Sequence, residues 1–297
     1  MIQKYRNRMV DIGIVLLFWG LLWAVCVRMV SYTDMTIGNE VEVVEAIRTA
    51  MQHRSKEATV RFRAWSANQD KVKKLMDHLV KEAYRESDDP RGGDYLRFQI
   101  GGYELRHTMD QGLFKYDYTI RLLPTLYTTA EQEEEVDERV NEVLEELDVG
   151  QGAGDFEKAR AVRDFVYDTV EYDVIHKKQK DSHLKTTAYA ALFYHRAVCQ
   201  GYAVLGYRLL KELGVDTRVV TGEARVDGNW ERHAWNLVFV DGNYYNMDLT
   251  LDKITESDAY FLKSDDSFAK DHRRDEEYRT KVFYQRYPMG EVDYRGR

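Results

Sequence analysis

The longest apolar pattern in the chain lies near its beginning. Residues 12–27 contain no charged side chain, and the apolar character extends over residues 9–30 with only Asp11 and Arg28 as interruptions. Such a run is about long enough to cross a hydrocarbon layer of ~30 Å as a helix. Arg28 can reach the interface with its long side chain. We therefore expect a single transmembrane helix at residues 9–30.

The charges around this run predict its orientation. Three basic residues precede it: Lys4, Arg6 and Arg8. Only Arg28 follows closely, so the positive-inside rule places a tail of residues 1–8 in the cytoplasm and the remaining chain outside. A cleavable signal peptide is the competing interpretation, but no small-x-small cleavage site closes the run. Cys26 is a poor lipoprotein site because Val25, and not a small residue, precedes it.

Alternating helix and strand patterns follow in residues 31–125. Apolar residues recur at helical spacing within 41–51 and 72–83. Three segments have strand-like patterns: Thr59–Trp65, Tyr95–Ile100 and Phe114–Leu122. These patterns predict a small α+β domain that ends near Leu123–Thr125, and it contains no catalytic constellation.

A second domain is expected over residues 126–297. Thr129 and Gln132 have the spacing of a helix capping box, and the acidic residues that follow form a solvated face. Gly150–Gly154 breaks this helix, and Asp155 is expected to cap the next one. The polar segment Asp173–Lys185 is expected to be a surface loop.

Composition and charge narrow the classes of function. A chain of 297 residues with 44% hydrophobic residues is long enough and apolar enough for two cores. Its formal net charge of -8 disfavours a nucleic-acid partner. Neither HExxH nor CxxC occurs in the sequence, and His176 and His183 lie without a partner at metal spacing. We therefore expect no metal and no cofactor.

Cys199 is the strongest candidate for chemistry. The only other cysteine, Cys26, lies inside the expected membrane helix, so the exported part holds one thiol and no intrachain disulfide. Cys199 begins an apolar helical pattern that ends at Gly214. A thiol at a helix amino terminus is favoured as thiolate by the helix dipole. A free cysteine is also often a small buried hydrophobe, so Cys199 alone does not establish a nucleophile.

Two downstream residues complete a catalytic pattern with Cys199. From His233 the sequence alternates as a strand does, and Asp241-Gly242 is a strong two-residue hairpin signal. This turn pairs Val240 with Asn243, Trp235 with Asp248, and His233 with Thr250. Asp248 would then share a face with His233, one diagonal step away.

Roles follow from this arrangement. Cys199 would attack a carbonyl, His233 would carry protons, and Asp248 would orient the imidazole. An oxyanion would form beside the Cys199 amide at the helix end. We expect the second donor near residues 183–187, without naming it.

Residues from about 125 to 278 resemble the transglutaminase-like superfamily of cysteine enzymes. Five blocks carry this resemblance: Val170–Asp173, Val198–Ala203, Arg218–Gly222, His233–Asn236 and Asp248–Thr250. Downstream, Tyr260–Leu262 and His272 also look like the carboxy-terminal part of bacterial members, and we interpret them as structural. No residues match the calcium sites of animal transglutaminases.

The resemblance implies a papain-like α+β core, in which a helix bearing Cys199 packs on an antiparallel sheet bearing His233 and Asp248. It implies acyl transfer through a thioester on protein or peptide substrates, including cell-wall peptides. The acceptor would be an amine, giving a crosslink, or water, giving proteolysis or deamidation. Two alternatives remain: a catalytically silent binding or scaffold module at the cell surface, and a protein whose amino-terminal domain does the work.

Overall fold

The structure is a computed structural model that describes residues 35–36, 39–65, 67–150, 152–175 and 183–296. The cytoplasmic tail expected at residues 1–8 and the helix expected at residues 9–30 lie outside these ranges. Within them, the helices are too short or too polar to span a membrane.

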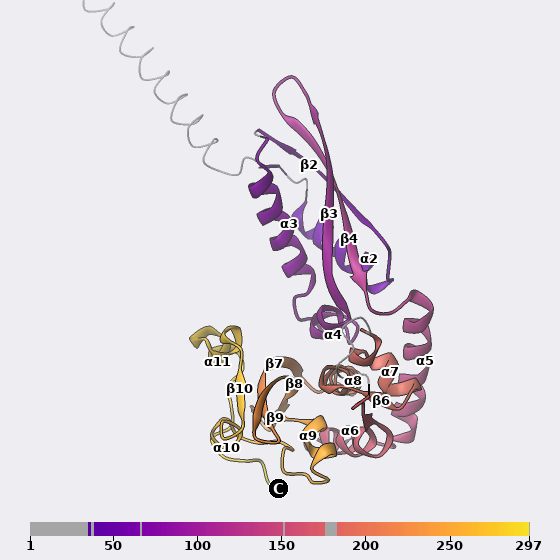
Figure 1. Ribbon diagram of the computed structural model, residues 1–297, viewed down its shortest axis with the longest axis vertical. Coiled ribbons are helices and arrows are strands. Elements are labelled where there is room, and N and C mark those ends of the chain that lie inside the picture. The colour runs from indigo at the N-terminus through magenta and orange to yellow at the C-terminus, as the bar shows by residue number, and fades with distance from the viewer. Residues whose placement is uncertain (1–34, 37–38, 66, 151, 176–182, 297) are drawn as a thin grey trace, which may run out of the picture.

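The amino-terminal unit is a four-stranded antiparallel sheet with helices packed on it (Figure 1). The strand order is β1-β2-β4-β3. The elements are β1 (Met35–Thr36), α2 (Glu40–Gln52), β2 (Ala58–Ala64), α3 (Gln69–Ala83), α4 (Gly93–Phe98), β3 (Ile100–Gln111) and β4 (Tyr116–Leu126). Alternate residues of β2 are buried, as its sequence pattern predicts, and they form one core with the apolar faces of α2 and α3.

One predicted strand in this unit is wrong. Residues 95–100 were expected to be extended, but Gly93–Phe98 form the short helix α4, and the strand begins only at Ile100. Tyr95 and Leu96 are adjacent and both fully buried, which a half-exposed strand does not allow. Gly93 has a φ of 53°, a left-handed conformation that favours glycine, and this turn starts the helix.

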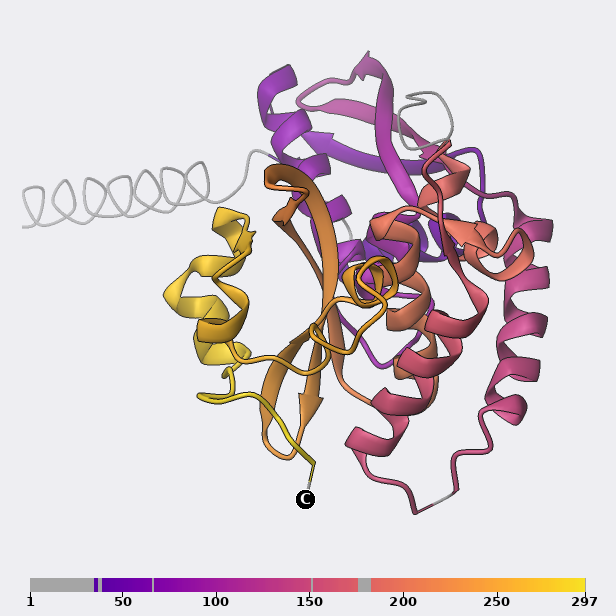
Figure 2. The same ribbon diagram turned by 60° about the horizontal axis from the view of Figure 1, so that its bottom comes forward.

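The carboxy-terminal unit places helices and a second antiparallel sheet side by side (Figure 2). Its sheet has the order β10-β7-β8-β9. The strands of this unit are β5 (Glu171–Tyr172), β6 (Arg196–Ala197), β7 (Thr217–Val226), β8 (Asn229–Val240), β9 (Asn243–Met247) and β10 (His272–Arg274). The α-helices are α5 (Ala130–Glu146), α6 (Asp155–Thr169), α7 (Ala188–Phe193), α8 (Cys199–Glu212), α9 (Leu249–Ile254), α10 (Asp265–Phe268) and α11 (Lys281–Arg286).

The two faces of this sheet have different coverings. Val219, Ala234 and Val238 belong to the large core that surrounds α8. Val220, Trp235 and Leu237 belong to a second core formed with the carboxy-terminal segment. Helix α8 is therefore the central support of one face, and residues beyond 260 cover the other.

Several local predictions are confirmed. Thr129 and Gln132 form the expected capping box of α5. Asp241 and Gly242 form the turn between β8 and β9, with positive φ at both, and Val240 pairs with Asn243. The cap predicted at Asp155 is displaced by one residue, because the N-cap of α6 is Gly154 and Asp155 is the first helical residue.

Buried charges join the two units. Arg218 on β7 binds the carboxylate of Asp94 on α4, with Nε at 2.7 Å from Oδ2, and Asp94 is almost fully buried. Tyr207 on α8 donates a hydrogen bond to Glu86 at 2.9 Å. Burial, followed by the nearby charge of Asp94, raises the pKa of Glu86 to about 7. A pair buried in this way is costly to separate, so it fixes how the units meet.

The absence of a side chain at Gly222 on β7 is predicted to allow the edge strand β10 to pair closely with β7. Gly222 pairs with His233 on one side and with Arg274 on the other, and an added Cβ would overlap the carbonyl oxygen of Arg273. Gly222→Ala should lower the free energy of unfolding by about 1–3 kcal/mol, the usual range for overpacking. Urea unfolding followed by tryptophan fluorescence measures this.

The matched control is Gly150→Ala, because an added Cβ there meets open space. If the two variants have the same free energy of unfolding, β10 can move away from the added methyl group at position 222 without loss of stability, and the prediction is wrong.

Candidate active site

Cys199 is the first residue of α8, as its sequence predicts. The N-cap residue is Val198, which makes no side-chain hydrogen bond to the helix. Cys199 is a partly exposed residue. Cys199 therefore lies at the positive end of the helix dipole without a side-chain cap competing for the amide groups.

Gly201 lets other parts of the chain approach the start of α8. An added Cβ would lie 2.7 Å from the Ala197 Cβ and 3.0 Å from the carbonyl oxygen of Lys185. The amide of Val198 donates to that same carbonyl at 3.0 Å. The segment around Lys185 thus packs directly beside Cys199.

His233 is buried on β8, and its side chain influences the Cys199 thiol. Burial acts to raise the pKa of this thiol, whereas the charge and hydrogen bond of the imidazole, and a hydrogen bond of the Ala234 amide, lower it. The stacked indole of Trp235, with ring centroids 6.2 Å apart, supports the imidazole. Strand β8 therefore supplies both the imidazole and a backbone donor to Cys199.

Asp248 lies directly after β9, and its carboxylate forms a hydrogen bond with the imidazole of His233. His233 Nε2 is 2.7 Å from Asp248 Oδ2. The two side chains are in contact, as predicted from the two-residue turn at Asp241 and Gly242. The predicted ladder beyond Met247 is wrong, however, since Asp248 is the N-cap of α9 and Thr250 lies inside that helix instead of pairing with His233.

The helix begins here because the Asp248 side chain itself caps it. Asp248 Oδ1 accepts hydrogen bonds from the amides of Thr250 and Leu251, both at 3.0 Å. An aspartate in this position satisfies amide groups that a helix start leaves unpaired. The same carboxylate therefore ends the strand, starts the helix and holds His233.

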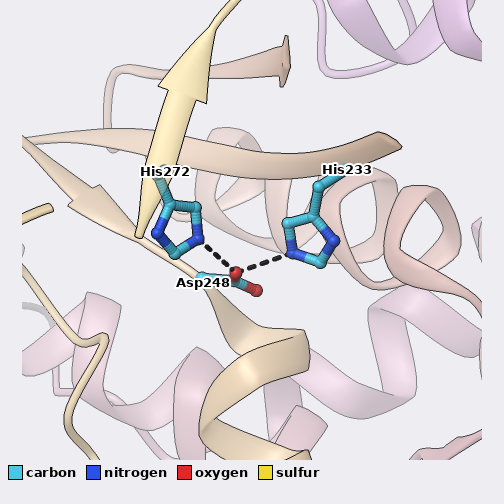
Figure 3. A group of neighbouring side chains, drawn as sticks. All are labelled: His233, Asp248 and His272. Carbon is cyan, nitrogen blue, oxygen red and sulfur yellow. Dashed lines mark hydrogen bonds and ion pairs between the residues drawn. The ribbon is translucent and has the colours of Figure 1, made fainter. Parts of the chain in front are cut away.

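His272 is the functional neighbour whose role sequence reasoning missed. Its Nε2 is 3.0 Å from Asp248 Oδ2, the oxygen that also binds His233 (Figure 3). Its Nδ1 is 2.7 Å from Asp271 Oδ1. From the sequence, His272 is interpreted as a structural residue. The resemblance to the family includes His272, and this was the available signal. The sequence does not show that β10 pairs with β7, and this pairing brings His272 to Asp248.

Charge interactions shift the pKa values of the site. Burial alone would raise the pKa of the Asp248 carboxyl, but His233 and then His272 hold it well below its usual range. Burial would lower the pKa of His233, yet the negative charges of Asp248 and Cys199 raise it to about 10. Burial disfavours the Cys199 thiolate, but the charge and hydrogen bond of His233 outweigh this and lower the thiol pKa. All three shifts favour a thiolate–imidazolium pair.

A metal would have to compete with these hydrogen bonds. The potential ligand atoms of His233, Asp248 and His272 lie within 4.8 Å of one another, and two imidazoles with a carboxylate suit zinc. Both imidazoles, however, point a nitrogen at the same carboxylate oxygen at hydrogen-bond distance (Figure 3). The arrangement as it stands is that of two N–H donors sharing one acceptor.

The segment in which the second oxyanion donor is expected packs against the start of α8. Leu184–Thr186 form a short 3-10 helix, and Lys185 offers its carbonyl oxygen, not its amide, to Val198. His183 stacks on Tyr127 with ring centroids 4.6 Å apart. His176 lies outside the described residues. The second donor stays an open prediction.

Comparisons with known proteins agree with the resemblance expected from the sequence. Residues 142–249 match the family model "Transglutaminase-like superfamily", and this match indicates a family of thiol-dependent enzymes. The matched range contains Cys199 and His233 and includes Asp248. A search of curated proteins finds no sequence similar to this chain.

Three solved structures are similar to parts of the chain. One is described as a TGase, with 17% identity, a TM-score of 0.37, and coverage of 65% of this chain and 51% of that chain. Another is a "putative cysteine protease" from Cytophaga hutchinsonii, with 18% identity, a TM-score of 0.31, and coverage of 51% and 65%. The third is a "putative protease" from Parabacteroides distasonis, with 13% identity, a TM-score of 0.26, and coverage of 50% and 37%. The chain thus spans about half the length of the first of these.

The pKa of Cys199 predicts how its alkylation depends on pH. In a Cys26→Ser chain, the rate of alkylation by iodoacetamide should rise at lower pH than in the same chain unfolded in urea, because a lowered pKa gives thiolate earlier. His233→Ala removes the positive charge and leaves burial and the negative charge of Asp248 to raise the pKa of the thiol against the hydrogen bond of the Ala234 amide. The rise should then move to higher pH than in the unfolded chain. Superimposable curves for the three samples would contradict the ion pair.

His272 is predicted to position Asp248. His272→Ala should lower the free energy of unfolding by about 1–3 kcal/mol, because a buried carboxylate loses one donor. It should also shift the alkylation curve of Cys199 to higher pH, by less than His233→Ala does. His272→Gln, which keeps an N–H donor, should restore part of that shift. A merely structural role for His272 would change the stability and leave the alkylation curve in place.

Proposed function

We propose that the chain is a thiol-dependent acyl-transfer enzyme that uses Cys199 as nucleophile, His233 as general acid and base, and Asp248 to orient the imidazole. The hydrogen bond of the His233 imidazole with the Asp248 carboxylate carries this proposal, together with the effect of that imidazole on the Cys199 thiol, whose pKa it lowers. A cysteine that only fills space in a core needs no such histidine–carboxylate pair. The family match over residues 142–249 supports the same reaction class.

The chemistry proceeds in two half-reactions. The Cys199 thiolate attacks an amide carbonyl carbon, and the carbonyl electrons move to oxygen. As the intermediate collapses, the C–N bond breaks and His233 gives its proton to the departing nitrogen, which leaves an acyl thioester. His233 then takes a proton from an incoming amine or water, which attacks the thioester, and the thiolate leaves. The amine acceptor gives a crosslink and water gives hydrolysis.

The start of α8 is the proposed oxyanion site. Cys199 is the first helical residue, so its amide belongs to the group that a helix leaves without an internal partner. Negative charge that develops on the carbonyl oxygen is stabilised there by this donor and by the helix dipole. The segment beside it, Leu184–Thr186, is the proposed source of the second donor.

We also propose that this chemistry takes place at the outer face of a membrane, on proteins or peptides that include cell-wall peptides. The support is the apolar run at residues 9–30 with basic residues before it. The amino terminus would then be cytoplasmic and both folded units extracytoplasmic.

A catalytically silent binding module is the alternative. The amino-terminal unit offers an open groove of about 540 Å³ between α3 and the edge strand β3, lined by Val72, Tyr103, Leu105 and His107 among others. Such a groove would serve a protein that binds a partner without reacting with it.

An assay of both half-reactions separates these functions. The purified chain in detergent micelles is incubated with a glutamine-containing protein and a fluorescent primary amine, beside a panel of peptides for hydrolysis. Cys199→Ala should abolish product, and His233→Ala should lower the rate by roughly 10²–10⁴-fold. Cys26→Ser is the matched control, a cysteine change outside the site, and should keep full activity. Product that persists in Cys199→Ala would contradict the proposed nucleophile.

A further inference from the structure

The tip of the β3–β4 hairpin carries large apolar side chains that face solvent. Leu113 and Phe114 occupy the loop and are 95% and 82% exposed. Trp65, just after β2, is 56% exposed and lies beside the loop, since the Lys115 ammonium is 4.5 Å from its ring centroid. We call Trp65, Leu113 and Phe114 the tip patch. Neighbouring large side chains exposed to this degree mark a contact surface.

The chain enters the fold at this same end of the sheet. Met35, the first residue of β1, pairs with Ala64, and Ala64 pairs with Tyr116. The loop that holds Leu113 and Phe114 comes immediately before Tyr116 and so extends beyond the point where β1 begins. Figure 1 shows this hairpin end at one extreme of the long axis and the carboxyl terminus at the other.

The length of chain before β1 limits how far the tip patch can be from the apolar run. Only four residues, 31–34, separate Val30 from Met35. A fully extended chain covers at most ~3.6 Å per residue, so Val30 lies within about 18 Å of Met35 whatever path it takes. If residues 9–30 cross a bilayer, the lipid surface therefore lies within reach of the hairpin end of the sheet.

The charges near the tip patch indicate what kind of surface it suits. Arg63 is paired with Asp117 at 2.7 Å, and Asp110 lies opposite Asp117 in the ladder. Lys115, a second cation at this end of the sheet, lies over the Trp65 ring. In the part of the hairpin end that the structure describes, Arg63 and Lys115 are matched by Asp110 and Asp117, so the attraction of the tip patch to a membrane is apolar, and an indole suits the interface.

We propose that the tip patch inserts into the interface of the lipid bilayer as a second membrane contact, which holds the molecule upright with its carboxy-terminal unit away from the lipid. The inference rests on the proposed anchor at residues 9–30. Two points of attachment, the anchor and the hairpin tip, fix an orientation that a single helix and a four-residue connection leave free. Neutral lipid is sufficient for this contact.

Nitroxide labels on single cysteines test the insertion. The chain has only two cysteines, so variants with one cysteine each need few substitutions. The full chain is reconstituted in vesicles of neutral phosphatidylcholine. One variant, Cys199→Ala, keeps Cys26 as the label site inside the proposed anchor. A second adds Cys26→Ala and Leu113→Cys, and a third adds Cys26→Ala and Val292→Cys. Val292 is the matched control, an apolar residue that is 75% exposed near the carboxyl terminus.

Collisions with dissolved oxygen report lipid, and collisions with a water-soluble nickel chelate report water. Labels at 26 and 113 should favour oxygen, and the label at 292 should favour nickel. A label at 26 in lipid with a label at 113 in water overturns the tip contact and leaves the anchor standing. A label at 26 in water overturns the anchor and the inference together.

A second measurement separates insertion from accidental closeness to the surface. A label at Trp65→Cys is read with and without the double change Leu113→Ser and Phe114→Ser. The loss of two apolar side chains from the lipid contact should lower the partition of the tip into lipid by roughly tenfold or more. An unchanged accessibility of the label at 65 contradicts insertion by these side chains.

Discussion

The carboxylate of Asp248 is the constraint on which the candidate site depends. It is fully buried, and a buried charge is tolerated only when its hydrogen-bonding capacity is filled. Its two oxygens accept from the amides at the start of α9 and from the imidazoles of His233 and His272. Strands β8 and β10 and helix α9 therefore converge on one anion. Thiol activation is one outcome of this convergence, and local stability is another.

A similar arrangement joins the two units of the molecule. Arg218 extends from β7 to the buried Asp94, while Glu86 and Tyr207 share the same small volume. Gly93 is required there, since a side chain at this position would overlap Glu86 and Tyr207. The amino-terminal unit is consequently held in place, because moving it would separate Arg218 from the buried carboxylate of Asp94.

The sequence was informative wherever one local pattern determined the structure. The capping box at Thr129, the turn at Asp241 and Gly242, and the start of α8 at Cys199 all follow from neighbouring residues, and the structure has each of them. The contact between His233 and Asp248 could be predicted because a two-residue turn fixes the register of a hairpin. The transglutaminase-like resemblance is matched by the family model over residues 142–249.

Long-range contacts explain what the sequence did not reveal. Residues 95–98 are helical because burial against α8 and the ion pair of Asp94 outweigh their strand-like composition. Asp248 leaves the ladder because its side chain caps a helix, and alternation of residue types does not encode that choice. His272 reaches Asp248 through pairing of β10 with β7, which are separated by about fifty residues, and no short-range rule connects them.

The position of His272 in the chain has a consequence for biosynthesis. A ribosome completes Cys199, His233 and Asp248 well before it reaches β10, the strand that carries His272. The nascent polypeptide therefore holds all three proposed catalytic residues while one donor to their shared carboxylate has not been made. The Asp248 carboxylate therefore gains the hydrogen bond of His272 only after β10 has been synthesised, and a product terminated before β10 would lack it.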